Sequence, residues 1–110
     1  MHQRAERVTA SSDLLGAEAL LNDFVESVRG LPQVLQVLAE GSASSLVIWT
    51  ALTAEPPDQT ERYAVYDAEL AAMDAHPEVR VKFELVNLAE YPGTPLDHLL
   101  PAQARRCFAR

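Results

Sequence analysis

The first segment with a clear pattern carries apolar side chains at helical spacing. They recur every three or four positions, which places them on one face of a helix. The series is Leu14, Ala17, Leu21, Phe24 and Val28, widened by Leu20 and Val25. Residues 11–13 (Ser-Ser-Asp) supply N-cap side chains before it, and Gly30 followed by Pro32 is a helix stop. We therefore predict a helix over residues 12–29.

Two short apolar runs after this helix have the composition of strands. Residues 34–39 are apolar except for Gln36, and residues 46–53 are rich in β-branched residues and contain the single tryptophan. Residues 41–45 between them are Gly, Ser and Ala, which is typical of a turn. So short a connection predicts an antiparallel hairpin, and the Pro-Pro pair at 56–57 ends its second strand.

A second helix is predicted from these prolines to Ala75. Asp58 stands three residues before Glu61, which is the spacing of a capping box. His76 followed by Pro77 closes the helix, because the residue before a proline avoids helical geometry. One stripe of the helix carries large side chains, which we expect to face the core. These are Tyr63, Tyr66, Leu70 and Met73.

The third predicted strand shows the clearest two-residue alternation. Apolar residues alternate with charged ones from Val79 to Leu85, so the charged face is expected to meet water or lie at a sheet edge. The pattern then weakens. Residues 91–95 contain two prolines and a glycine and predict a loop, and residues 96–100 predict one helical turn. Residues 105–109 predict a last short edge strand.

The predicted order is therefore α-β-β-α-β, with a final β where residues 105–109 pair. This order is typical of a two-layer α+β domain, in which two helices pack on an antiparallel or mixed sheet of three or four strands. Residues 1–10 are expected to be a disordered lead-in and residues 11–110 a single domain. The second helix has the length of a right-handed crossover. The third strand then lies either beside the first strand or parallel to the second.

Composition and charge disfavour two classes of partner. Apolar residues make up 48% of the 110 residues and charged residues 23%, with no apolar run near the ~20 residues of a membrane-spanning helix. Nine basic against sixteen acidic residues leave a net charge of −7, which repels nucleic-acid phosphates. We therefore expect no membrane and no nucleic-acid partner. A single cysteine, Cys107, and an N-terminus without an apolar secretory segment favour a reducing, cytoplasmic setting.

Side chains with catalytic or metal-binding chemistry are present, but not at the spacing of a known motif. The histidines, His2, His76 and His98, have no second ligand at helical spacing, and there is no paired-cysteine motif or phosphate loop. Cys107 stands beside Arg106, which favours a thiolate, but no orienting base is fixed near it. We expect no metal and no cofactor. A non-enzymatic protein fits this chain better than an enzyme does, and no catalytic residue is assigned.

The second predicted helix carries one candidate ligand-binding group. Arg62, Tyr66 and Glu69 stand at i, i+4 and i+7, so they share one strip of the helix surface. Arg62 and Glu69 are placed to bracket the Tyr66 ring and hydroxyl, as in a small polar recognition patch. The alternative is an exposed arginine and glutamate that flank a tyrosine at the core edge, with pairings worth about a few tenths of a kcal/mol.

The second predicted strand is apolar on both faces. Leu46, Ile48 and Leu52 line one face, and Val47, Trp49 and Ala51 line the other. A half-exposed antiparallel strand would alternate polar and apolar residues, so both faces are expected to be covered. Either the two helices lie on opposite faces of the sheet, or a second chain covers the face of Trp49. An apolar patch centred on a tryptophan has the composition of an interface core.

Three functional hypotheses follow. The first is a non-enzymatic protein-protein interaction or regulatory module, which forms a homodimer or other homo-oligomer or binds another protein through the Trp49 face. The second is a small-molecule-binding or enzymatic domain with a pocket near the second helix, at Arg62, Tyr66 and Glu69. The third is an antitoxin-like protein that neutralises a basic partner through its acidic charge.

Overall fold

The computed structural model describes residues 16–41, 45–55 and 58–110. Over these ranges the chain forms two helices and a four-stranded mixed sheet in the order α-β-β-α-β-β, which confirms the predicted α+β class. Within them, no helix is both long enough and apolar enough to cross a bilayer. The predicted lead-in, the first N-cap side chains, the middle of the hairpin turn and the Pro-Pro pair lie outside the described residues.

The predicted hairpin forms the middle of the sheet. β1 (Val34–Gly41) and β2 (Leu46–Leu52) are antiparallel, with Leu38 opposite Trp49. β4 (Arg105–Ala109) pairs antiparallel with β1, so the short last strand predicted at these residues is confirmed.

The third strand takes one of the two pairings left open by the sequence. β3 (Val81–Asn87) runs parallel to β2, and α2 (Thr60–Ala75) connects the two strands. The sheet order is β3-β2-β1-β4, so β3 and β4 are its edges. The charged face of β3 carries an ion pair between Lys82 Nζ and Glu84 Oε1 at 3.1 Å and is largely exposed, as the alternation predicted.

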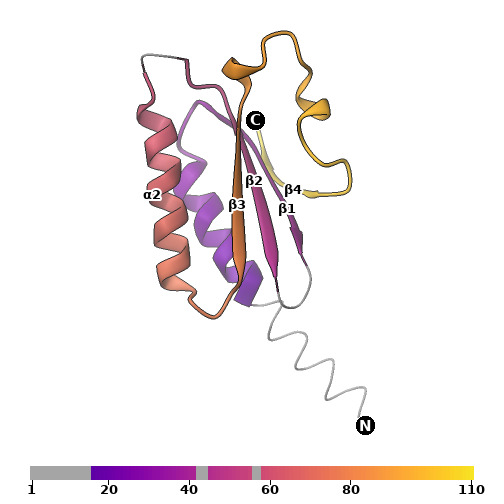
Figure 1. The fold of residues 1–110 in the computed structure, drawn as a ribbon. Helices are drawn as coiled ribbons and strands as arrows, with labels where there is room; N and C mark the ends of the chain where they lie inside the picture. Colours follow the sequence, from indigo (N-terminus) through magenta and orange to yellow (C-terminus); the bar gives the residue numbers. More distant parts are fainter. Residues whose placement is uncertain (1–15, 42–44, 56–57) are drawn as a thin grey trace.

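Both helices lie on the same face of the sheet (Figure 1). The first helix, residues 16–28 in the described part, buries Leu20, Phe24 and Val28 in the core. The centroid of the Phe24 ring lies 5.1 Å from that of Phe83 on β3. The apolar face predicted for this helix is therefore confirmed within the described residues. The sequence left two ways to cover both faces of β2. The one that placed the two helices on opposite faces of the sheet is wrong.

The second face of the sheet carries the end of the chain. Residues 88–104, with the short 3-10 helices η1 (Leu88–Glu90) and η2 (Leu96–His98), lie on this side, opposite the two helices (Figure 1). Leu38 and Ala51 are buried although they do not belong to the helix-side core. The C-terminal segment of the chain itself therefore covers part of this face.

α2 packs against the rest of the protein through small side chains. Its buried residues are Val65, Ala68 and Ala72, whose size lets the helix backbone approach its neighbours closely. The large side chains predicted to face the core lie on the other side of the helix, where Tyr63 and Leu70 are exposed. The prediction for this stripe is wrong because α2 has two apolar faces, and the one with small residues is the one that packs.

The start of α2 is held by contacts other than the predicted capping box. Asp58 Oδ1 accepts a hydrogen bond from the backbone N of Thr60 at 3.1 Å, and hydrogen bonding to Thr60 lowers the pKa of the Asp58 carboxyl. Glu61 does not reach back to the cap. Its Oε1 accepts from the backbone N of Gln33 at 2.8 Å. The capping-box prediction is therefore wrong, since Glu61 ties α2 to the turn before β1.

Arg110 joins the end of β4 to the turn after the first helix. Its guanidinium donates to three backbone oxygens: Nε to Val34 at 2.7 Å, and Nη2 to Arg29 at 2.6 Å and to Leu31 at 2.7 Å. These carbonyls lie at and after the helix end and need hydrogen-bond donors, which Arg110 supplies. The sequence contains no signal for this contact, because the partners are backbone atoms 76 to 81 positions away.

Candidate functional site

α2 presents a row of large, largely apolar side chains to solvent. Tyr63, Tyr66 and Leu70 are 63%, 37% and 58% exposed, and they stand three and four positions apart on one face of the helix. The ring centroids of Tyr63 and Tyr66 lie 6.3 Å apart. Met73, the next position in the series, is half-buried. We call Tyr63, Tyr66 and Leu70 the outer row of α2.

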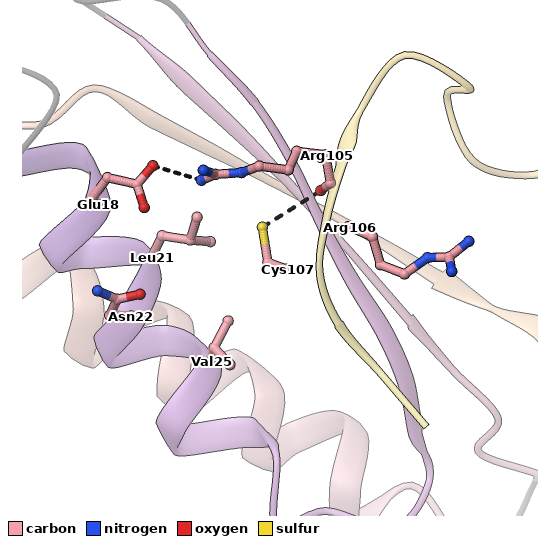
Figure 2. Close-up of a pocket in the computed structure, with 7 residues that line it drawn as sticks. All are labelled: Glu18, Leu21, Asn22, Val25, Arg105, Arg106 and Cys107. Carbon is pink, nitrogen blue, oxygen red and sulfur yellow. Dashed lines mark hydrogen bonds and ion pairs between the residues drawn. The ribbon is translucent and has the colours of Figure 1, made fainter.

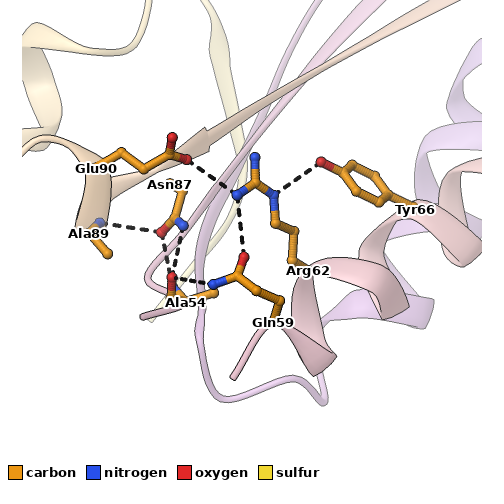
Figure 3. A network of polar contacts seen from close by, with 7 residues as sticks. All are labelled: Ala54, Gln59, Arg62, Tyr66, Asn87, Ala89 and Glu90. Atoms are coloured by element: carbon orange, nitrogen blue, oxygen red, sulfur yellow. Dashed lines mark hydrogen bonds and ion pairs between the residues drawn. The ribbon is translucent and has the colours of Figure 1, made fainter. Parts of the chain in front are cut away.

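Arg62 connects this row to η1, which follows β3 (Figure 3). Its Nε donates to the Tyr66 hydroxyl at 3.1 Å, and its Nη1 lies 3.3 Å from Gln59 Oε1 and 3.3 Å from Glu90 Oε1. The guanidinium therefore has three partners, one of which is the Tyr66 hydroxyl. Two members of the predicted trio, Arg62 and Tyr66, are thus brought together.

Glu69, the third member of that trio, does not join the network. Its carboxyl is half-buried and forms no hydrogen bond or ion pair with any residue that the structure describes. Burial away from water raises the pKa of this carboxyl to about 7. Glu69 therefore has a carboxyl group with a pKa of about 7 and no cationic partner among the described residues.

Two further carboxylates border the outer row. Asp67 and Asp74 are exposed, and neither forms an ion pair within the described part of the chain. Helical spacing places both beside Tyr63 and Leu70, on the side away from Arg62. The outer row is therefore a strip with carboxylates on both of its borders.

A second polar cluster lies at the ends of β2 and β3, and its polar atoms are hydrogen-bonded to one another. Asn87 Oδ1 accepts from Ala54 N at 2.9 Å and from Ala89 N at 3.2 Å, and Asn87 Nδ2 donates to Ala54 O at 2.8 Å (Figure 3). Asn87 is buried, so it anchors the two strand ends and does not form an open site. Sequence reasoning missed it, although Asn87 continues the apolar alternation from Val81 to Leu85 and so occupies a core-facing position.

The sheet face predicted as an interface is partly covered. Ala51 is buried, whereas Val47 and Trp49 are half-buried. In the sheet, Trp49 lies between Leu38 of β1 and Glu84 of β3. The apolar patch is therefore smaller than the strand sequence alone indicated, and a charged residue borders it.

A groove of about 420 Å³ lies on this second face, between β1 and the C-terminal segment. Gln36 and Leu38 line it from the sheet, and Leu100 and Pro101 line it from the segment, with Arg106 beside them. The Arg106 guanidinium has no hydrogen-bond or ion-pair partner among the described residues. Asp97 also lines the groove, so it combines apolar side chains with one residue of each charge.

A smaller cavity of about 240 Å³ lies between the first helix and β4 (Figure 2). Cys107 borders it, with Sγ 3.5 Å from the backbone oxygen of Arg105, and Arg105 Nη2 lies 2.6 Å from Glu18 Oε1. Burial raises the pKa of the Cys107 thiol, and the nearby Arg105 charge does not offset it. Arg106 points away from the thiol (Figure 2), so the prediction that Arg106 favours a thiolate is wrong.

His76, at the end of α2, contacts the first helix. Its Nε2 lies 2.6 Å from Asp23 Oδ2, and its Nδ1 lies 3.9 Å from Glu78 Oε1. In the part of the chain that the structure describes, no three His, Cys, Asp or Glu side chains are grouped to hold a metal ion. The contact joins the end of α2 to the middle of the first helix.

The chain matches no protein-family model, no curated protein and no solved structure. An α+β order of this kind is shared by proteins of many functions, so the fold implies none. The function is therefore inferred from the side chains on α2 and on the second face of the sheet.

Proposed function

We propose that this domain is a non-enzymatic protein-interaction module, and that the outer row of α2 is its binding surface. The observation that carries the proposal is the use of the two faces of α2. The helix packs in the core through three small residues and leaves three of its large ones, Tyr63, Tyr66 and Leu70, exposed. The partner is a second copy of the chain or another protein, in a reducing, cytoplasmic setting.

The composition of the outer row supports this proposal. Single exposed apolar residues are common on any protein, but a contiguous strip on one helix face is typical of an interaction site. Tyrosine is enriched in protein interfaces, because its ring buries a large area while its hydroxyl keeps a polar partner. Anchors three and four positions apart are also the spacing by which helices bind in grooves or against other helices.

The contact between Arg62 and Tyr66 gives the row a defined shape before binding. The hydrogen bond from Arg62 Nε holds the Tyr66 hydroxyl, and the contact to Glu90 holds the guanidinium. A side chain that is already ordered loses less conformational entropy on association. This supports Tyr66 as an ordered anchor of the interface.

A second candidate surface is the face of Trp49. Trp49 and Val47 are half-buried, and a groove of about 420 Å³ lies on the same side of the sheet. A partner strand or loop placed there would complete the cover that residues 88–104 begin. This surface ranks second because the protein already covers part of it.

A ligand-binding or enzymatic role is the alternative from another class, and Glu69 is the observation in its favour. A carboxyl with a pKa of about 7 is suited to proton transfer at neutral pH. This alternative predicts that Arg62→Ala and Glu69→Ala abolish the thermal shifts that small molecules cause in the unmodified protein. A compound library that causes no shift would exclude it.

The interaction module is tested by mass in solution, measured for the protein alone and after capture from an extract of its native host. The variants are Tyr63→Ser with Leu70→Ser on the outer row, Trp49→Glu on the second face, and Tyr91→Ser as a control. Tyr91 is a 47% exposed tyrosine that lies outside α2. We expect the outer-row variant alone to lose the assembly while its circular dichroism is unchanged.

The other outcomes distinguish the surfaces. If only Trp49→Glu loses the assembly, the interface lies on the second face of the sheet and not on the outer row. A protein that is monomeric at micromolar concentration and captures no partner overturns the proposal.

A further inference from the structure

The outer row of α2 has the geometry of a helix-pairing seam. Positions 63, 66, 70 and 73 are separated by three, four and three residues, which is the heptad spacing of helices that pack side by side. These positions lie within the 16 residues of α2 and extend over about 15 Å of the helix. The buried residues Val65, Ala68 and Ala72 lie on the opposite side of the helix. The seam is therefore free to receive a partner while α2 stays packed on its own domain.

Both borders of the seam carry carboxyl groups. Asp67 and Asp74 lie on one border, and Glu69 lies on the other with Arg62. The Arg62 guanidinium already contacts Tyr66, Gln59 and Glu90, whereas the three carboxylates form no ion pair with any described residue. Asp67 and Asp74 therefore give the seam negative charge that the described part of the protein does not neutralise.

We propose that the outer row of α2 binds a basic amphipathic helix, with apolar side chains along one face and lysine or arginine on both borders of that face. The proposal rests on the interaction module proposed above and specifies the chemistry of its partner. Apolar side chains of the partner cover Tyr63, Tyr66 and Leu70. Its basic side chains pair with Asp67, Asp74 and Glu69.

A second copy of the chain fits the same seam less well. Each copy brings three carboxylates and one arginine to the borders, and that arginine is already paired with Glu90. Each copy also carries a net charge of −7. A symmetric pair through α2 would therefore place carboxylates of the two copies against each other, and this repulsion favours a partner of opposite charge.

Glu69 also favours a cationic partner. Its carboxyl is half-buried and lacks a positive neighbour, so its charged form is disfavoured in the free protein. A lysine or arginine brought to this border would stabilise the charged form. The partner therefore supplies a contact that the free domain lacks.

The test uses two synthetic peptides of about 18 residues, or about five helical turns. Both carry leucine at the heptad positions and alanine elsewhere, and they differ only at the border positions, which are lysine in one peptide and glutamate in the other. Fluorescence anisotropy measures binding of each labelled peptide to the full chain. We expect the lysine peptide to bind at least about ten-fold more tightly than the glutamate peptide.

Protein variants separate the apolar and the charged contributions. The double substitution Tyr63→Ser with Leu70→Ser is expected to lower the affinity for the lysine peptide by about ten-fold or more. The double substitution Asp67→Asn with Asp74→Asn is expected to lower the affinity for the lysine peptide by about five-fold and to make that affinity less dependent on salt concentration. The matched control is Asp97→Asn, an exposed carboxylate of η2 on the other side of the sheet, which should change nothing.

Four results would overturn the inference. Equal affinity for both peptides would show that the protein has no preference for a basic partner. Unchanged binding of the lysine peptide to the outer-row variant would show that the peptide is attracted by charge alone and does not use the seam. A dimer of the unmodified protein that the outer-row variant abolishes makes a second copy the occupant. These three results leave the interaction module itself standing. Failure of both peptides to bind excludes a basic helix, and the capture experiment then decides separately on the module.

Discussion

Asn87 holds both backbone polar groups of Ala54. The Asn87 Oδ1 accepts from the Ala54 N at 2.9 Å, and the Asn87 Nδ2 donates to the Ala54 O at 2.8 Å. The backbone pairing between β2 and β3 ends at Leu52 and Asn87. Beyond that point, the Asn87 side chain supplies the hydrogen bonds that a continued strand pairing would have given to Ala54. Both residues are buried, so water cannot take over these bonds.

Asn87→Ala is expected to lower the free energy of unfolding by about 2–3 kcal/mol, because it leaves the buried Ala54 N–H without an acceptor. Urea denaturation measures the change. Asn22→Ala, which removes an exposed asparagine from the first helix, is the control and should change stability by less than about 0.5 kcal/mol. A value for Asn87→Ala as small as that of the control would show that the anchor contributes little.

Glu69 is expected to make the protein less stable as the pH rises towards neutral. The folded protein holds this proton more tightly than the unfolded chain, because burial raises the pKa from the ordinary 4.5 to about 7. Its contribution is therefore full below pH 4.5 and is lost as the pH rises through about 7. Because the carboxyl is only partly buried, solvent screens the effect, which is on the order of 1 kcal/mol.

The measurement for Glu69 is the free energy of unfolding in urea at several pH values from about 4.5 to about 8, for the unmodified protein and for Glu69→Gln. The difference between the two proteins isolates this group from the other carboxylates. Asp67→Asn, an exposed carboxylate of the same helix, is the control. A difference that does not vary with pH would contradict the assignment.

Cys107 is expected to react slowly with alkylating agents in the folded protein. Burial raises the pKa of its thiol above the ordinary 9.0, so less of it is thiolate at a given pH. Iodoacetamide labelling at about pH 8 should be several-fold slower for the folded chain than for the chain in urea. Arg105→Ala should slow it further, because the Arg105 charge lowers the thiol pKa.

The control for this labelling is Lys82→Ala, which removes a cation from β3, at the opposite edge of the sheet. It should leave the labelling rate unchanged. A folded chain that reacts as fast as the unfolded one would show that burial does not shield the thiol from water.

Local patterns in the sequence determined the secondary structure. The alternation from Val79 to Leu85, the short turn cluster between the first two strands, and the stop at His76 and Pro77 each predicted an element that the structure contains. The same holds for the short strand at residues 105–109. These signals depend on a residue and its near neighbours in the chain, so they can be interpreted without knowledge of the rest of the fold.

The candidate site was predictable only in part. The spacing of Arg62 and Tyr66 predicted their contact, because residues four apart on a helix lie side by side. The isolation of Glu69 and the closed cluster at Asn87 were not predicted, since burial and partners at both sites depend on where the packed elements lie.

Only the tertiary structure decided which face of α2 is buried, how β3 pairs, and what covers the second face of the sheet. The sequence pattern marked Tyr63, Tyr66 and Leu70 as one apolar row, yet α2 packs through Val65, Ala68 and Ala72. The path of residues 88–104 over the sheet carries no periodic signal at all. Burial is set by the distance between two packed elements and by the side chains on both of them. The pattern along one element therefore shows where its apolar faces are, but not which face the protein uses.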